Sequence, residues 1–153
     1  MTASMSIILV LPLFFTSACA SNKGIVELQR VTTDVGHISL IRDEPTRAEV
    51  LEVIAAWLAE NGYDYSVLEP GQKPSGTALN YRAWWGWDVG IYMKRVNMQV
   101  ARNGTSLGKI KFDALQYGGF GKFGSSVERL RTLLDALFAK IDRDTANELL
   151  GDQ

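Results

Sequence analysis

The sequence predicts an α+β fold, a two-layer sandwich in which a mostly antiparallel sheet of about five strands carries two helices on one face. Two segments, residues 46–61 and 126–142, repeat apolar residues at the spacing of an amphipathic helix. Between them, apolar and polar residues alternate over residues 79–112, which is typical of half-buried strands. A length of 153 residues suits one domain with a single core. The expected order of elements is therefore β-α-β-β-β-β-α.

The first half of the domain is predicted to place a helix between short strands. Thr46 and Glu49 have the spacing of a capping box, which begins a helix, and Gly62 supplies a left-handed stop at its other end. Before this helix, residues 25–33 are expected to form either a short edge strand or ordered coil, and residues 37–43 are expected to form the first core strand. The strand-like segments lie at residues 25–33, 37–43 and 63–69.

A first hairpin is predicted around Gly86. Every odd-numbered residue of segment 79–93 is apolar, and the run is longer than a usual strand. A three-residue loop centred on Gly86 would set Ala83 opposite Val89 and place every apolar pair on one face. We therefore expect the chain to reverse at this glycine.

A second hairpin is predicted at residues 102–105, RNGT. The apolar phase switches to even positions after residues 94–95, which indicates a bulge there. A two-residue loop, 103–104, would set Ile110 opposite a polar residue. A loop that begins one residue earlier sets it opposite Val96 and keeps the core face consistent, so we expect the three-residue loop.

The last helix is expected from about Ser126 to Asp142, and Ser125 with Glu128 has the spacing of a second capping box. The segment before it, GGFGKFGSS, contains the string G-x-G-x-x-G. A dinucleotide-binding loop needs a parallel βαβ unit with an acidic residue about 20 residues later. Here a charged tail follows the helix, so we interpret the glycines as a crossing from strand to helix.

The composition argues against nucleic-acid binding. Acids and bases are interspersed, and the formal net charge is −1. A nucleic-acid interface normally shows a basic stripe. We expect no nucleic acid, no nucleotide, no metal and no cofactor.

The N-terminal segment differs from the rest of the chain. It has no charged side chain before Lys23, and its apolar run covers residues 7–15. This run is too short for a transmembrane helix, which needs about 20 apolar residues. It fits the apolar region of a secretory signal peptide. The only cysteine, Cys19, follows Thr-Ser-Ala at the expected cleavage site.

Ser17, Ala18 and Cys19 resemble a bacterial lipobox, although Thr16 stands where Leu, Val or Ile is usual. The resemblance implies that Cys19 becomes a lipidated mature N-terminus anchored in a membrane. No Asp follows the cysteine, which resembles the sorting pattern of outer-membrane lipoproteins facing the periplasm. The resulting division of the chain is a signal peptide at 1–18, a tether at 19–24 and a domain at 25–153.

A wider pattern resembles small uncharacterised lipoproteins of proteobacteria. In that pattern a Trp-Asp pair opens a strand, a glycine-containing hairpin follows, and a Lys-Phe segment precedes the last helix. The matching residues are Trp87, Asp88, Tyr92, Gly104, Gly108, Lys122 and Phe123. The resemblance covers roughly residues 38–138 and implies a lipid-anchored α/β domain. It implies no activity and no catalytic residues.

The sequence offers one candidate surface and no catalytic constellation. His37 is the only histidine, and we interpret it as a solvent-side turn residue without metal or catalytic partners. Trp84 is expected on the face opposite its neighbours in WWGW, together with Arg82, Tyr92 and Lys94. An exposed Trp beside cations can bind a sugar, a peptide or a protein. Alternatively, this face packs under a loop or the N-terminal segment, and then the indole would be buried.

Three functions follow as hypotheses. The first is a non-catalytic adapter of the envelope, which contacts an unidentified envelope protein and should show a flat apolar patch. The second is a small-ligand or carbohydrate binder using the Trp84 face, which should show a concave pocket with convergent polar groups. The third is a hydrolase, which would require titratable residues clustered in a cleft.

Overall fold

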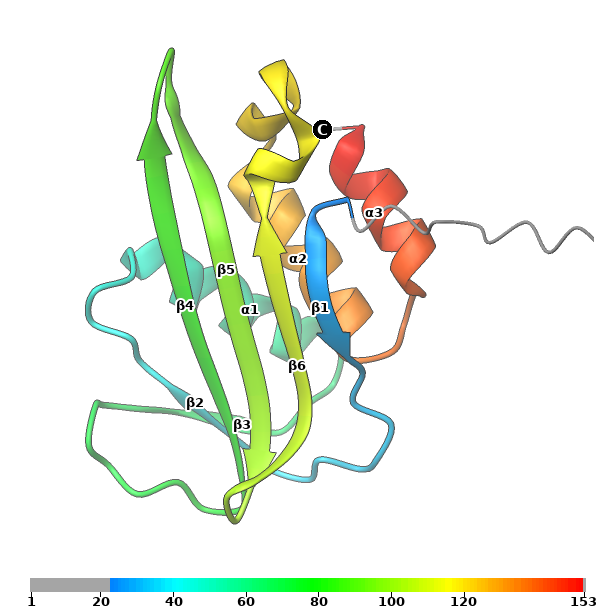
Figure 1. Ribbon diagram of the computed structural model, residues 1–153. Helices are drawn as coiled ribbons and strands as arrows, with labels where there is room; N and C mark the ends of the chain where they lie inside the picture. Colours follow the sequence, from blue (N-terminus) through cyan, green and yellow to red (C-terminus); the bar gives the residue numbers. More distant parts are fainter. Residues whose placement is uncertain (1–22, 153) are drawn as a thin grey trace, which may run out of the picture.

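Six strands form one mixed sheet in the order β1-β6-β5-β4-β2-β3, accompanied by three helices (Figure 1). A computed structural model describes residues 23–152, and the predicted signal peptide and Cys19 lie outside the described residues. The strands are β1 (Ile25–Gln29), β2 (Ile38–Ile41), β3 (Tyr65–Leu68), β4 (Thr77–Trp87), β5 (Ile91–Arg102) and β6 (Thr105–Asp113). The helices are α1 (Ala48–Glu60), α2 (Ser126–Leu137) and α3 (Arg143–Gly151), with 3-10 turns η1 (Ala114–Tyr117) and η2 (Gly119–Phe123). The predicted α+β class is confirmed, with one strand and one helix more than predicted.

The sheet is antiparallel from β1 to β4 and parallel from β4 to β3. The parallel part arises because α1 links β2 to β3, and a helical crossover returns the chain in the same direction. In Figure 1, α1 and α2 lie behind the strands, while α3 lies beside β1. One face of the sheet is thus covered by helices, and the other is open.

The core lies between the sheet and the two long helices. Trp57 of α1 is 2% exposed and stacks on Tyr63, with ring centroids 5.7 Å apart. Its indole Nε1 donates a hydrogen bond of 3.0 Å to Asp135 of α2, which joins the two helices. The fully buried strand residues on this side include Ile38, Leu40, Leu79, Val96, Val100 and Ile110.

The first hairpin does not reverse at Gly86 as predicted. Strand β4 continues to Trp87, and the turn lies between it and Ile91, so Ala83 faces Val96. The predicted bulge is present, because Trp84 pairs with Arg95 and the next pair skips Lys94. This extra residue explains the switch of apolar phase, since it lets odd residues of β4 face even residues of β5 across one core side.

The second hairpin closes with two residues, not three. Arg102 pairs with Thr105, and Asn103 and Gly104 have φ of 51° and 80°, as a type I′ turn requires. The register shift that corrects the core face lies instead within β6, where Val100 pairs with Gly108 but Ala101 with Ser106. The three-residue loop that we expected is therefore wrong, and the two-residue loop is correct. The bulge in β6 keeps the apolar residues on the core face, which the longer loop was expected to do.

The first predicted capping box is also wrong. Helix α1 begins at Ala48 without a side-chain cap. Thr46 is buried and donates to Asp43 Oδ2 at 2.6 Å, while its Oγ1 accepts the N–H of Ala83 at 3.1 Å. The hydroxyl thus links the helix entry to β4 and is not available as a cap.

The second cap is confirmed at the start of α2. Ser125 accepts the backbone N–H of Glu128 at 3.3 Å. The predicted last helix ends at Leu137, and the tail forms a separate helix, α3, which buries Ala146 and Leu150. The glycine segment before α2 is the turn η2, and it connects β6 to α2 as a crossing. Among residues 23–152, no helix is long and apolar enough to cross a membrane.

Candidate functional site

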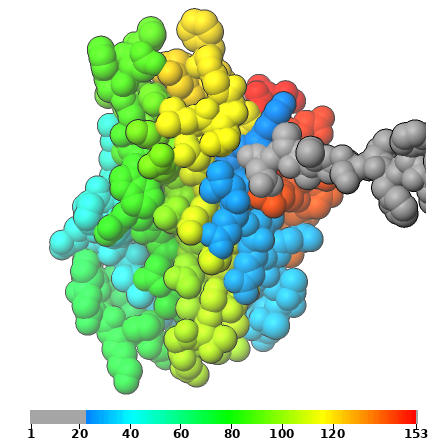
Figure 2. Space-filling view, in the orientation of Figure 1, coloured from blue at the N-terminus to red at the C-terminus, as the bar shows by residue number. Residues whose placement is uncertain are grey.

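The open face of the sheet carries polar side chains in ordered rows. Successive side chains of a strand alternate between faces, so residues paired across strands share a face. Backbone register therefore aligns three rows on this face: Gln29, Lys109, Gln99 and Asn80; Glu27, Lys111, Asn97 and Arg82; and Asp113, Arg95 and Trp84. This face is turned toward the viewer in Figure 2.

A groove of about 600 Å³ runs over these rows. We call it the open-face groove. Its lining comes from strands β2, β4, β5 and β6 and from the segment after β2. The lining residues are Ile41, Arg42, Asp43, Asn80, Tyr81, Arg82, Trp84, Asn97, Met98, Gln99, Lys109, Ile110 and Lys111. Side chains that can donate and accept hydrogen bonds thus converge on one concavity.

Trp84 stands at one end of the open-face groove with 40% of its surface exposed. The indole is not buried under a loop, so the condition set for a binding surface is met. Beside it, the Arg82 guanidinium donates to Asp43 through Nη2 at 2.7 Å and through Nε at 3.1 Å. The bidentate pair fixes the plane of the guanidinium in the lining of the groove.

Asp43 is held in its ionised form. Partial burial by itself raises the pKa of the Asp43 carboxyl, but hydrogen bonds from Arg82 and Thr46 outweigh it and hold that pKa below its usual range. The same hydrogen bond raises the pKa of Arg82. The ion pair is therefore a fixed feature of the groove at neutral pH.

The other cationic side chains of this face also form ion pairs with carboxylates. Glu27 bridges Lys109 at 2.5 Å and Lys111 at 2.7 Å, and Arg95 contacts Asp113 at 2.9 Å. Hydrogen bonds from the two lysines lower the pKa of the Glu27 carboxyl. The face is therefore polar and fixed by pairs without a strong net charge, which does not suit a polyanion.

The four residues predicted to form one surface do not stay together. Arg82 and Trp84 line the open-face groove, whereas Tyr92 and Lys94 do not. Tyr92 is only 7% exposed, because its ring packs on Phe123 and against the bare Cα of Gly86, the residue with which it pairs. Lys94 is the extra residue of the bulge, so it has no partner on β4 and belongs to none of the three rows.

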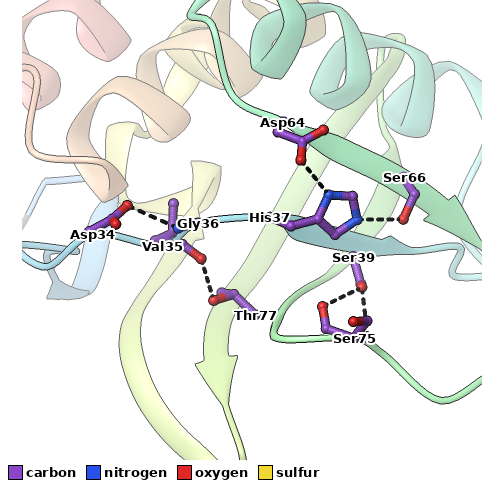
Figure 3. A network of polar contacts seen from close by, with 9 residues as sticks. All are labelled: Asp34, Val35, Gly36, His37, Ser39, Asp64, Ser66, Ser75 and Thr77. Carbon is purple, nitrogen blue, oxygen red and sulfur yellow. Dashed lines mark hydrogen bonds and ion pairs between the residues drawn. The ribbon is translucent and has the colours of Figure 1, made fainter.

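A second polar cluster lies where β2 and β3 begin (Figure 3). His37 Nδ1 lies 2.9 Å from Asp64 Oδ2, and His37 Nε2 lies 2.9 Å from Ser66 Oγ. With the proton on Nδ1, the ring donates to the carboxylate and accepts the serine hydroxyl. This order, Ser66–His37–Asp64, is that of an acyl-transfer relay. His37 is therefore not an isolated turn residue.

The sequence analysis missed this relay because its members come from two strands. Parallel pairing of Ile38 with Tyr65 sets His37 beside Asp64 and Ser66. The available signal was a pair of polar residues two positions apart at the start of each strand, His37 and Ser39 in one and Asp64 and Ser66 in the other, which places each pair on one face. Neither His37 nor Ser66 lines the open-face groove, and the Asp64 side chain is 82% exposed.

Neighbouring hydroxyls fix the loop beside the relay. Ser39 Oγ accepts the N–H of Ser75 at 3.2 Å, and Thr77 Oγ1 donates to the Val35 carbonyl at 2.6 Å (Figure 3). Within residues 23–152, no group of three or more His, Cys, Asp or Glu side chains is placed to hold a metal ion.

Comparison of the chain with protein-family models, with curated proteins and with solved structures finds no match in any of the three. The site is therefore interpreted from its own geometry.

Proposed function

We propose that the chain is an envelope lipoprotein, anchored through Cys19 in the outer membrane and facing the periplasm, whose domain binds a hydroxyl-rich ligand such as a glycan segment in the open-face groove. The observation that carries the binding proposal is a half-exposed Trp84 at the end of a groove lined by amides and fixed ion pairs. The anchor is supported by the lipobox-like residues before Ala20.

The chemistry of the groove suits a sugar. One face of a pyranose ring is made of C–H groups, which pack on an aromatic ring such as that of Trp84. Its hydroxyls both donate and accept hydrogen bonds, and so do the exposed amides of Asn80, Asn97 and Gln99. Because these side chains stand on paired strands, little ordering is required when a ligand binds.

The open-face groove supports the binder over the adapter. An adapter using the Trp84 face should present a flat apolar patch, whereas this face carries a groove with amides and paired charges in its lining. A binder should present convergent polar groups around an aromatic platform, and these are the features of the groove.

Titration of the full chain with soluble fragments of peptidoglycan glycan tests the binding proposal, with the heat of binding measured by calorimetry as the readout. Trp84→Ala should weaken binding about tenfold or more, because truncating an aromatic anchor costs roughly 2 kcal/mol. Trp87→Ala is the matched control, since Trp87 lies outside the groove, and should bind like the wild type. Equal binding by Trp84→Ala, or no binding by the wild type, would contradict the proposal.

The anchor is tested separately by Cys19→Ser in cells supplied with labelled palmitate. The wild type should incorporate the label and fractionate with the outer membrane. The variant should remain unlabelled and accumulate as precursor. Acylation of the variant would rule out Cys19 as the lipid attachment site.

The relay of Ser66, His37 and Asp64 favours a second candidate function, ester hydrolysis. Ser66 Oγ would attack the carbonyl carbon while His37 Nε2 takes the hydroxyl proton and returns it to the leaving alcohol. Water would then release the acid and restore the serine. A fluorophosphonate probe should label the wild type and not Ser66→Ala, with Ser39→Ala as the control. Absence of labelling in the wild type would exclude this function.

A further inference from the structure

Four large apolar side chains are exposed together at one end of the domain, and we call them the apolar tip. They come from the end of β4, the turn after it, the start of β5, and η2. Their exposed fractions are 79% for Trp87, 83% for Val89, 62% for Ile91 and 84% for Phe120. Figure 1 shows the β4–β5 turn and η2 at the same end of the molecule. Exposed apolar clusters of this kind mark contact sites.

Packing beneath the tip joins its two segments. The rings of Tyr92 and Phe123 meet edge to face with centroids 5.4 Å apart. Lys122 pairs with Asp88 of the turn, and its ammonium lies 5.5 Å from the centroid of the Tyr92 ring. A Cβ at Gly86 would lie 2.6 Å from that ring, so the glycine is needed for the close approach.

A buried arginine fixes the tip from below. Arg129 of α2 is fully buried, and its guanidinium donates to the carbonyls of Lys122 at 2.7 Å and Gly121 at 2.5 Å. Burial lowers the pKa of this guanidinium. The chain thus uses a buried cation to hold the turn that exposes Phe120, which shows that the exposure belongs to a built surface.

The N-terminal segment joins the domain at this same end. The backbone N–H of Asp113, the last residue of β6, donates to the Gly24 carbonyl at 2.8 Å. The hydroxyl of Tyr117, in η1 directly before η2, donates to the Lys23 carbonyl at 3.4 Å. Only three residues lie between Cys19 and Lys23, and the four Cα-to-Cα steps from one to the other span at most about 14 Å. A lipid on Cys19 would therefore hold this end of the domain at the bilayer.

We propose that the apolar tip inserts into the interfacial region of the bilayer beside the N-terminal anchor. The inference rests on the membrane attachment proposed above. Trp is favoured at the membrane–water interface because its ring is amphipathic, and Val, Ile and Phe side chains enter the acyl region. The tip then acts as a second contact beside the N-terminal anchor, and it holds the sheet upright so that the open-face groove faces the aqueous phase beside the bilayer.

Fluorescence quenching on vesicles tests this insertion. The purified full chain is reconstituted into phosphatidylcholine vesicles whose acyl chains carry bromine, which quenches tryptophan only at contact distance. Trp87→Phe and Trp84→Phe form a matched pair, because each removes one partly or largely exposed indole. Trp87→Phe should lose most of the bromine-dependent quenching, whereas Trp84→Phe should retain it.

The outcomes separate the tip from the anchor. If the chain floats with the vesicles and Trp87→Phe is quenched like the wild type, the tip does not insert, although the anchor stands. If the chain does not float, both are overturned. If Trp87 is unquenched and the chain self-associates with increasing concentration, the tip is an interface between copies, and insertion is again overturned.

Discussion

The open-face groove and the apolar tip are two surfaces of opposite chemistry in one small domain. In the groove, Trp84 is the exposed aromatic residue, and its neighbour Arg82 is paired with Asp43. At the tip, large apolar side chains such as Trp87 and Phe120 are almost fully exposed. A polar face with matched charges suits reversible binding of a polar ligand, whereas exposed apolar groups are kept only where something covers them.

The two surfaces also differ in what supports them. The groove residues stand on regular strand rows, where the backbone ladder fixes their positions whatever the side chains are. The tip residues stand on the ends of β4 and β5, the turn between them and a 3-10 helix, and this arrangement depends on Tyr92, Phe123 and Arg129 beneath it. Single substitutions should therefore leave the groove folded and dismantle the tip.

The largest effect is expected for Tyr92→Ala. It removes a buried ring that packs on Phe123 and Gly86, and such truncations cost about 3 kcal/mol or more of unfolding free energy. Trp84→Ala should cost less than about 1 kcal/mol, because much of its ring is already exposed. Denaturant unfolding of both variants measures the difference. Similar losses would show that the two surfaces are supported alike.

The next effect is expected for Arg129→Met, which keeps the volume and removes the guanidinium. The carbonyls of Gly121 and Lys122 lose their donor inside the protein, at a cost of roughly 2 kcal/mol. Hydrogen exchange should accelerate over η2 and remain unchanged in β4. Arg131→Met on the same helix is the control, because its pair with Glu60 is exposed and contributes little. Unchanged exchange in η2 would contradict the support assigned to Arg129.

The contrast between Trp84 and Tyr92 also marks the limit of sequence reasoning. The class of the fold and most elements were predictable, because periodicity reports which side of a strand or helix is buried. The hairpin at Gly86 was not, because a glycine that accommodates a neighbouring ring looks the same in the sequence as a glycine that makes a turn. Likewise, no local pattern indicates that Phe123 of η2 packs on the Tyr92 ring and helps to bury it.

The residues of the candidate sites also fall into those that local spacing predicts and those that only strand pairing brings together. Arg82 and Trp84 were found because they alternate on one strand, so their shared face follows from spacing alone. The relay of His37 with Asp64 and Ser66 depends on pairing between β2 and β3, which no local pattern states. The carboxylates that pair with the cations of the open face, such as Asp43 and Glu27, likewise lie on other segments of the chain.

A smaller effect is expected for Asp43→Asn, and it should depend on pH. Because the pKa of Asp43 is lower in the folded protein than its usual 3.8, the ionised carboxylate stabilises the fold above that pH. The variant should lose about 1 kcal/mol at neutral pH, since Arg82 is half exposed. The difference should shrink as the pH falls below the usual carboxyl pKa, as unfolding curves at several pH values would reveal. A difference that does not change with pH would assign the loss to packing.

The smallest effect on stability is expected for Glu27→Gln, and it tests what the ion pairs of the groove are for. Glu27 contacts both Lys109 and Lys111, but all three side chains are partly exposed. Exposed pairs are screened by solvent and salt, so the thermal midpoint should shift less than for Asp43→Asn, and not at all in high salt. Glycan binding should nevertheless weaken, because the two ammonium groups are no longer fixed beside the amides of the neighbouring strand. A large loss of stability that persists in high salt, with unchanged binding, would show that these pairs serve the fold and not the groove.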